Sequence, residues 1–335
     1  MAVRQDISID ETGFSGLSVS AAGSQLQLPQ GFDVFVAAFQ REGSDLVVTE
    51  PDGDTLRVTD YFRSEVPADL VADNGAVLKG SLVVTLAGPV APGQYAQAGA
   101  TDTSLAIGQV ETLEGAATVQ RSDGTVETLG SETLIFQNDV VSTGSDGSVS
   151  LIFVDGTIFT LAANSRMVID ELIYSEGGAG NSGAFNLVQG SFVFIAGQVA
   201  KTGDMEVATP TATMGIRGTT VLVDVTTERG VATVEVALTR DFDGSVGVVE
   251  LRDLDGNLIS NITTTDLKWI VSPVAGETRS VERTAEDDAA DNILIAEAFT
   301  AFQIATNRVE GGDSYIRQGS SSPGNPNVLE SDPTE

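Results

Sequence analysis

The sequence predicts a mainly all-β protein with one helix near its end. Short runs rich in Val, Ile, Thr and Phe recur from Leu26 onward, and turn residues separate them. Asp-Gly or Asn-Gly pairs fall between many of these runs, and glycine readily adopts the positive φ angles of tight turns. One stretch, over residues 284–308, has the apolar spacing of an amphipathic helix.

The first predicted unit is a small strand-rich module over residues 8–95. Its expected strands include Asp45 to Thr49 and Thr55 to Thr59, with the Asp52-Gly53 turn between them. A stretch of small and polar residues over 96–106 follows, and this composition is typical of a linker.

The rest of the chain divides into a dense β region, a helix and a tail. Strand-like runs are densest over residues 107–225, and those over 226–283 are predicted to continue the same β domain. Thr284 can cap the helix over 284–308, because acidic residues follow it at the positive end of the helix dipole. Residues 311–335, rich in Ser, Pro, Gly and Asn, are predicted to be disordered. The apolar face of the helix is predicted to dock on the β-core and consists of Leu294, Ile295, Ala298, Phe299, Ala301 and Phe302.

Most of the turn-forming pairs are predicted to be hairpin turns, because these dipeptides readily adopt the positive φ angles that a tight hairpin requires. These pairs are Asp52-Gly53, Asn74-Gly75, Asp123-Gly124, Asp146-Gly147, Asp155-Gly156, Asp243-Gly244 and Asp255-Gly256.

The composition excludes several kinds of chemistry. The 335 residues hold 48 Asp and Glu against 17 Lys and Arg, a formal net charge of -31. A field of this sign repels nucleic acid and anionic lipid, so neither is expected as a partner. The chain has no Cys and no His, which removes thiol nucleophiles, imidazole bases, disulfides and Cys/His metal sites.

Residues 107–225 resemble the FecR-like domain family, a β-rich module best known from periplasmic parts of bacterial iron-signalling regulators. The resemblance implies a compact solenoid-like or sandwich-like β-fold, and its motifs name no catalytic residue. The motifs are Gly108 to Val119, Asn138 to Gly144, Val149 to Thr157, Leu161 to Ser165, Leu187 to Phe192, Ala208 to Thr213 and Gly215 to Thr219.

Two features differ from the iron regulators. Those proteins carry a membrane span and a sigma-factor-binding segment before this domain, whereas here a second strand-rich unit precedes it. Residues 43–62 of that unit resemble the N-terminal prefix modules of large bacterial surface adhesins. The N-terminus lacks the basic start and apolar core of a secretory signal, and no run reaches the roughly 20 apolar residues that cross a bilayer.

Calcium is a candidate ligand at two acidic turns. Asp241 with Asp243, and Asp253 with Asp255 and Asn257, place oxygen ligands at alternate positions, as the start of a calcium loop does. The later Glu of an EF-hand loop is missing, because its positions hold Arg252 and Thr264. Hairpin turns explain the same residues, and no other cofactor is predicted.

Arg217 is a candidate for binding a partner's carboxylate, since a guanidinium recognises such groups with two hydrogen bonds. An internal ion pair in so acidic a protein is the alternative.

Two functions follow from these observations. The first is a non-enzymatic scaffold at the bacterial envelope or surface, which binds protein or polysaccharide or associates with itself and supports adhesion. The alternative is an envelope signalling or regulatory component that binds a partner protein. A carboxylate-based enzyme is a third hypothesis, but with 48 acidic residues a plausible carboxylate pair carries no weight. We expect the cell surface or the medium as the location, reached without an ordinary signal peptide, with periplasm and cytoplasm as alternatives.

Overall fold

This computed structural model of the protein describes residues 17–18, 25–89, 105–178, 180–202, 204–274 and 277–316. Most of the predicted linker over 96–106, and the part of the predicted tail after residue 316, therefore lie outside the described residues.

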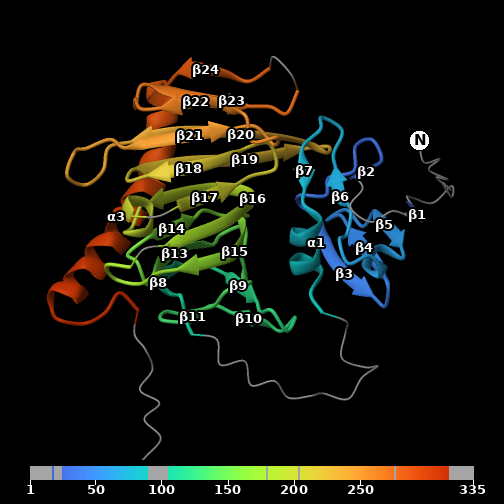
Figure 1. Ribbon diagram of the computed structural model, residues 1–335, viewed down its shortest axis with the longest axis horizontal. Coiled ribbons are helices and arrows are strands. Elements are labelled where there is room, and N and C mark those ends of the chain that lie inside the picture. Colours follow the sequence, from blue (N-terminus) through green and yellow to red (C-terminus); the bar gives the residue numbers. More distant parts are fainter. Residues whose placement is uncertain are drawn as a thin grey trace, which may run out of the picture.

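The centre of the molecule is a sandwich of two open β-sheets that share one long strand, β16 (Ser182–Ile195) (Figure 1). All pairings within them are antiparallel except that between β16 and β17. One sheet is called the helix-side sheet, because the long C-terminal helix covers it. Its strands lie in the order β11 (Leu134–Ile135), β8 (Gly108–Glu114), β13 (Ser148–Phe153), β14 (Ile158–Leu161), β16, β19 (Thr220–Glu228), β20 (Val231–Thr239), β23 (Leu267–Val271), β24 (Arg279–Glu282). The other sheet is called the module-side sheet, because the N-terminal module covers it. Its strands lie in the order β10 (Val126–Thr128), β9 (Ala117–Gln120), β12 (Val140–Thr143), β15 (Arg166–Ile173), β16, β17 (Asp204–Ala208), β18 (Thr213–Arg217), β21 (Val248–Arg252), β22 (Leu258–Ile262).

Strand β16 crosses from one sheet to the other at Gly190. Residues before it pair with β15 and β17, and residues from it onward pair with β19. Gly190 has φ +97°, and a Cβ atom there would lie 2.1 Å from Oγ of Ser165. Only glycine fits this crossing, because it tolerates positive φ and needs no room for a side chain.

The core of the sandwich forms between the two sheets. Alternating residues of both sheets point into it, as the period of a β-strand dictates. The ring centroid of Phe159 lies 4.7 Å from that of Phe185 and 4.8 Å from that of Phe194. The predicted all-β, sandwich-like fold class is therefore confirmed.

Most of the Asp-Gly and Asn-Gly pairs lie in hairpin turns, as predicted. In six of the seven pairs only the glycine has positive φ, and its N–H donates to the carbonyl three residues earlier. At Asp123 the carboxylate also accepts the Thr125 N–H at 2.8 Å, which fixes the turn. Five of the pairs join neighbouring antiparallel strands, whereas Asp146-Gly147 and Asp243-Gly244 lie where the chain passes from one sheet to the other.

The N-terminal module covers the outer face of the module-side sheet. It consists of β1 (Leu17–Ser18), β2 (Gln25–Gln27), β3 (Ala38–Glu42), β4 (Asp45–Thr49), β5 (Thr55–Thr59), a 3-10 turn (Tyr61–Arg63), β6 (Asp69–Val71), β7 (Val77–Leu78) and α1 (Gly80–Ala87). Its core continues onto Val140, Val168 and Val188 of the sandwich. The Asn74 amide donates to the Ala232 carbonyl at 2.7 Å across this interface.

Helix α3 (Ala285–Glu310) covers the opposite outer face, on the helix-side sheet (Figure 1). Thr284 caps the helix, as predicted, and it forms a capping box with Asp287. Ala298, Ala301 and Ala305 are its fully buried residues, and these small side chains let the helix approach the sheet closely. The sandwich thus lies between two coverings made by the same chain.

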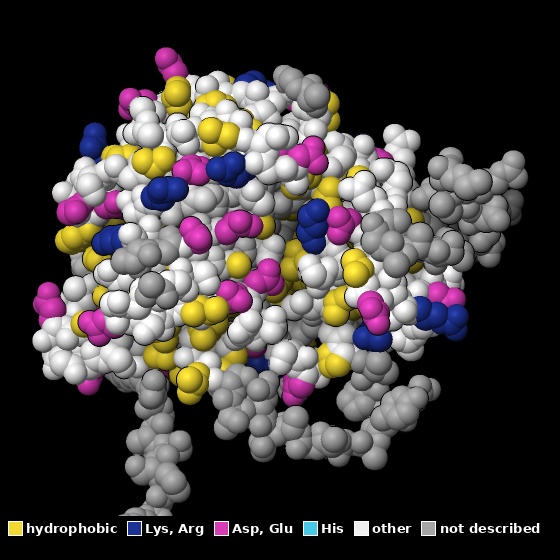
Figure 2. Space-filling view, in the orientation of Figure 1, with side chains coloured by type: hydrophobic (Ala, Val, Ile, Leu, Met, Phe, Trp, Pro, Cys, Tyr) yellow, Lys and Arg dark blue, Asp and Glu magenta, His cyan; other side chains and the backbone are white. Residues whose placement is uncertain are grey.

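On the face shown in Figure 2, acidic and basic side chains are interspersed over the sandwich and the module. No large patch of one sign stands out on that face.

Candidate functional site

The FecR-like motif from Val149 to Thr157 ends in a turn whose carboxylate is buried. Asp155 is 0% exposed. Its Oδ1 accepts the Thr157 N–H at 2.9 Å, and its Oδ2 accepts the Thr157 hydroxyl at 2.7 Å and the Val199 N–H at 3.0 Å. The carboxylate therefore ties the β13–β14 turn to the segment that follows β16, which is a structural role.

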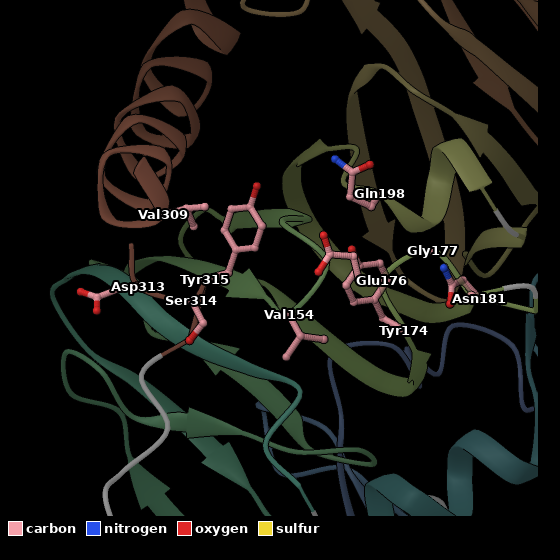
Figure 3. A pocket seen from close by; sticks show the side chains of 11 residues that line it. Val154, Tyr174, Glu176, Gly177, Asn181, Gln198, Val309, Asp313, Ser314 and Tyr315 are labelled. Atoms are coloured by element: carbon pink, nitrogen blue, oxygen red, sulfur yellow. The ribbon is translucent and has the colours of Figure 1, made fainter. Parts of the chain in front are cut away.

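A cavity of about 660 Å³ opens beside this turn (Figure 3). Four separate segments build it: the β13–β14 turn, the loop after β15, the residue before the short helix α2 (Val199–Thr202), and the end of α3 with the chain that follows. Its lining residues are Val154, Tyr174, Glu176, Gly177, Gly178, Asn181, Gln198, Val309, Asp313, Ser314 and Tyr315.

Two tyrosine rings and one carboxylate dominate the cavity. Figure 3 shows Tyr174 and Tyr315 on opposite sides of it, with Glu176 extending from beside Tyr174 into the space between them. Asp313 lies beyond Tyr315 and points away. The Tyr174 and Tyr315 hydroxyls and the Glu176 carboxylate form no hydrogen bond or ion pair within the described part of the chain.

The electrostatic character of the cavity is negative. Burial raises the pKa of Tyr174, and the charges of Glu176 and Asp155 raise it further. None of the described residues that line the cavity is basic. The carboxyl end of α3, which contributes Val309 to the wall, adds partial negative charge.

Both tyrosines are held in place. The ring of Tyr315 lies on Gly156, where a Cβ atom would come within 2.9 Å of the ring, and the Tyr315 carbonyl accepts a hydrogen bond from Arg308 at 2.7 Å. Tyr174 precedes a loop that Asn181 closes, since its side chain accepts the Ser175 N–H at 2.9 Å. Gly156 and Arg308 thus hold Tyr315, whereas Tyr174 packs against the core of the sandwich.

The sequence did not single out these residues. Tyr315 lies within the tail predicted to be disordered over 311–335, yet the next residue, Ile316, is only 2% exposed. The prediction of disorder is therefore wrong for residues 311–316, and residues 317–335 lie outside the described residues. No local motif marks Tyr174 or Glu176, and their significance depends on segments brought together by the fold.

The first pair of calcium candidates, Asp241 and Asp243, accepts hydrogen bonds in the turn where the chain passes from one sheet to the other. Asp241 accepts the Thr220 hydroxyl at 2.7 Å, and Asp243 accepts the Ser245 N–H at 2.9 Å. Hydrogen bonding from Ser245 lowers the pKa of Asp243, whereas burial raises that of Asp241.

The second set of calcium candidates lies in the β21–β22 hairpin. Asp253 accepts the N–H groups of Asp255 and Asn257 at 3.0 and 2.8 Å, and the Asn257 amide at 3.0 Å. Neither set forms a cluster of three carboxylates with metal-like spacing in the described chain. Their oxygens act as turn acceptors, and calcium binding there stays a prediction.

Arg217 lies at the end of β18, 71% exposed, with its guanidinium 3.1 Å from the Glu250 carboxylate. This contact is the internal ion pair given above as the alternative. A role of Arg217 in partner binding stays a prediction.

Among the described residues, the acidic group with metal-like spacing is Glu50, Asp52 and Asp54 in the N-terminal module. Glu50 also accepts the Asp33 N–H at 2.9 Å, and Asp52 accepts that of Asp54 at 3.2 Å. These carboxylates, like the others, take part in turn geometry.

The fold defines a two-sheet β-sandwich domain with the N-terminal module on one outer face and α3 on the other. Residues 139–239, from β12 to β20, match the model of the family described as FecR protein. Residues 139–239 are therefore similar to the FecR family, as the motifs predicted, and the match extends beyond the predicted end at residue 225. The resemblance of the N-terminal module to adhesin prefix modules stays a prediction.

Two crystal structures of a candidate anti-sigma factor from Parabacteroides distasonis ATCC 8503, at 2.50 Å and 1.65 Å resolution, resemble part of the chain. In each case the identity is 16%, the TM-score is 0.34, and the match covers 45% of this chain and 63% of the other. The chain thus matches less than two thirds of that protein's length. The comparison with curated proteins found no match.

No helix among the described residues has the length and apolar character needed to cross a membrane.

Proposed function

We propose that this chain is a non-enzymatic regulatory component of the bacterial envelope that acts by binding a partner protein. The observation that carries the proposal is the match of residues 139–239 to the FecR family. Regulatory proteins of the envelope are the best-known members of that family. Of the two functions predicted from the sequence, this proposal takes the signalling hypothesis. The adhesion scaffold is supported only by the short resemblance of the N-terminal module to adhesin prefix modules.

The architecture supports a compact binding protein. The outer faces of the two sheets are covered by the N-terminal module and by α3. Partner contacts are thereby left to the coverings, the loops and the sheet edges. The edge strands of the two sheets are short, since β11 has two residues, β10 three, β24 four and β22 five. Short edges offer few unpaired backbone groups for strand addition, which disfavours the self-association expected of a scaffold.

Deleting the gene from its native host tests the proposal. A regulatory component predicts a change in a limited set of transcripts, restored when the unaltered chain is supplied again. An adhesion scaffold predicts altered attachment or aggregation of cells with the transcripts unchanged, and that result would overturn the proposal.

Fractionation of the host, followed by antibody detection, tests the proposed location. Retention in the periplasm or at a membrane fits an envelope regulator. Recovery in the medium or on the outer surface contradicts it and favours the scaffold.

A further inference from the structure

We infer that the cavity beside the Asp155-Gly156 turn binds an organic cation, a guanidinium or ammonium group, between the rings of Tyr174 and Tyr315. The charge class of the ligand follows from the cavity itself. Its source, a side chain of a partner protein, rests on the proposed function.

The chemistry of the lining selects a cation. The face of a tyrosine ring carries negative electrostatic potential, so a cation placed over it is attracted. Tyr174 and Tyr315 present two such rings across one space, and Glu176 adds a full negative charge between them. An anion would meet this carboxylate with no basic side chain in the lining to offset the repulsion.

The contrast with other carboxylates of the chain strengthens the inference. Glu111 pairs with Arg308 under the end of α3, and Glu235 pairs with Lys268 at 2.8 Å. Glu176 is an exposed carboxylate and has no such partner among the described residues. A cation bound between the two rings would therefore meet a carboxylate that is not already paired.

The site is also preformed. Gly156 supports the ring of Tyr315, Arg308 holds its backbone, and Asn181 closes the loop that carries Glu176. A cation can bind without first ordering Tyr315, which lowers the entropic cost of binding. The acidic protein as a whole attracts a basic partner over longer distances.

Isothermal titration calorimetry of the full chain tests the inference. The probes are N-acetyl-arginine methylamide, spermidine, a short arginine-containing peptide, and the same peptide with citrulline, which keeps the shape of arginine but lacks its charge. We expect the arginine peptide to bind and the citrulline peptide not to bind. Added salt should weaken the binding, because charge attraction is screened.

Variants locate the binding in the cavity. Glu176→Gln is expected to weaken binding by about tenfold, the loss of one charge-assisted contact. Tyr315→Leu should weaken it by about threefold to tenfold, whereas Tyr174→Phe, which keeps the ring, should leave it nearly unchanged. Glu65→Gln is the matched control, since it removes one exposed charge of the N-terminal module far from the cavity lining.

The outcomes separate this inference from the proposed function. Binding of the arginine peptide that Glu176→Gln weakens and Glu65→Gln does not supports the cavity and a protein source. Binding of spermidine alone supports the cation but overturns the protein source. No binding by any cation, equal effects of Glu176→Gln and Glu65→Gln, or binding of calcium chloride alone overturns the inference and leaves the proposed regulatory role standing.

Discussion

Replacing Glu111 with Leu is expected to destabilise the protein by about 3 to 5 kcal/mol. Glu111 on β8 and Arg308 on α3 form an ion pair whose side chains are 1% and 9% exposed. Removing the carboxylate leaves a buried guanidinium without a counter-charge, and this uncompensated charge is the source of the cost. The remaining described hydrogen bond of Arg308, to the Tyr315 carbonyl at 2.7 Å, does not neutralise it.

The double variant Glu111→Leu with Arg308→Met isolates this cause. Replacing both members of a buried pair with apolar residues is often neutral or stabilising, so the double variant should be more stable than Glu111→Leu alone. Arg217→Met is the exposed control. Because 71% of the Arg217 side chain is exposed beside Glu250, this change should cost about 0 to 1 kcal/mol.

Urea unfolding followed by the fluorescence of Trp269, the single tryptophan, measures these differences. A lower midpoint with an unchanged m-value indicates a loss of stability rather than a change in the surface exposed on unfolding. Hydrogen exchange over α3 shows whether the helix detaches locally or the sandwich unfolds as one unit. A cost of Glu111→Leu below about 1 kcal/mol, or a double variant no more stable than the single one, would refute the reasoning.

Three further predictions concern other parts of the molecule. Gly190→Ala should lower the free energy of unfolding, measured by thermal unfolding, by at least about 3 kcal/mol, because the position has positive φ and a Cβ atom would clash with Ser165. Gly256→Ala is the control, since Gly256 has φ +83° but open space around it, and this change should cost about 1 to 2 kcal/mol. Equal losses for the two variants would contradict the role of the close contact at Gly190. Burial raises the pKa of Asp224, so its contribution to stability is fully present below the ordinary value of about 3.9 and is lost as the pH rises through the raised value. Asp224→Asn should therefore be more stable than the native protein at pH 7, and melting curves should show this advantage shrinking toward pH 4; a constant advantage would rule out titration as the cause. Val188→Asp should release the N-terminal module and speed proteolysis between module and sandwich, whereas Val66→Asp, at a position 60% exposed, should leave the cleavage pattern unchanged.

Local features of the fold could be predicted from the sequence. The Asp-Gly and Asn-Gly pairs marked turns because glycine readily supplies positive φ, as it does in six of the seven pairs. Thr284 with the acidic residues after it marked the start of α3. The resemblance of the motifs to the FecR family implied a solenoid-like or sandwich-like β-fold, and the structure is a sandwich. The glycines and alternating apolar residues of the motifs indicated turns and inward faces. These signals all lie within a few residues of the structure they determine.

Long-range relations could not be predicted in the same way. The apolar face of α3 included Phe299 and Phe302, yet the fully buried residues are Ala298, Ala301 and Ala305, because close approach to the sheet favours small side chains there. The aromatic pair instead lies near Phe242, with ring centroids 6.0 and 6.1 Å from it.

The cavity could not be predicted from the sequence either, because it too depends on contacts between segments that are far apart in the chain. Its walls come from Val154, Tyr174, Gln198 and Tyr315, which the chain brings together only after both sheets and α3 have assembled. Periodicity reports which side of a strand or helix is apolar, and it does not report which loops meet at the end of a sandwich.

The shared strand β16 has a consequence for how the sandwich assembles. The strands that precede it in the chain, β8 to β15, lie on one side of it, and those that follow, β17 to β24, lie on the other. Each side can begin from local hairpins, whose ends are close together in sequence and meet quickly. The two sides become a single cooperative body only when β16 has paired with both, because it carries all the strand pairing between them in the described chain. Its amides should therefore gain protection late in refolding and exchange slowest in the finished protein.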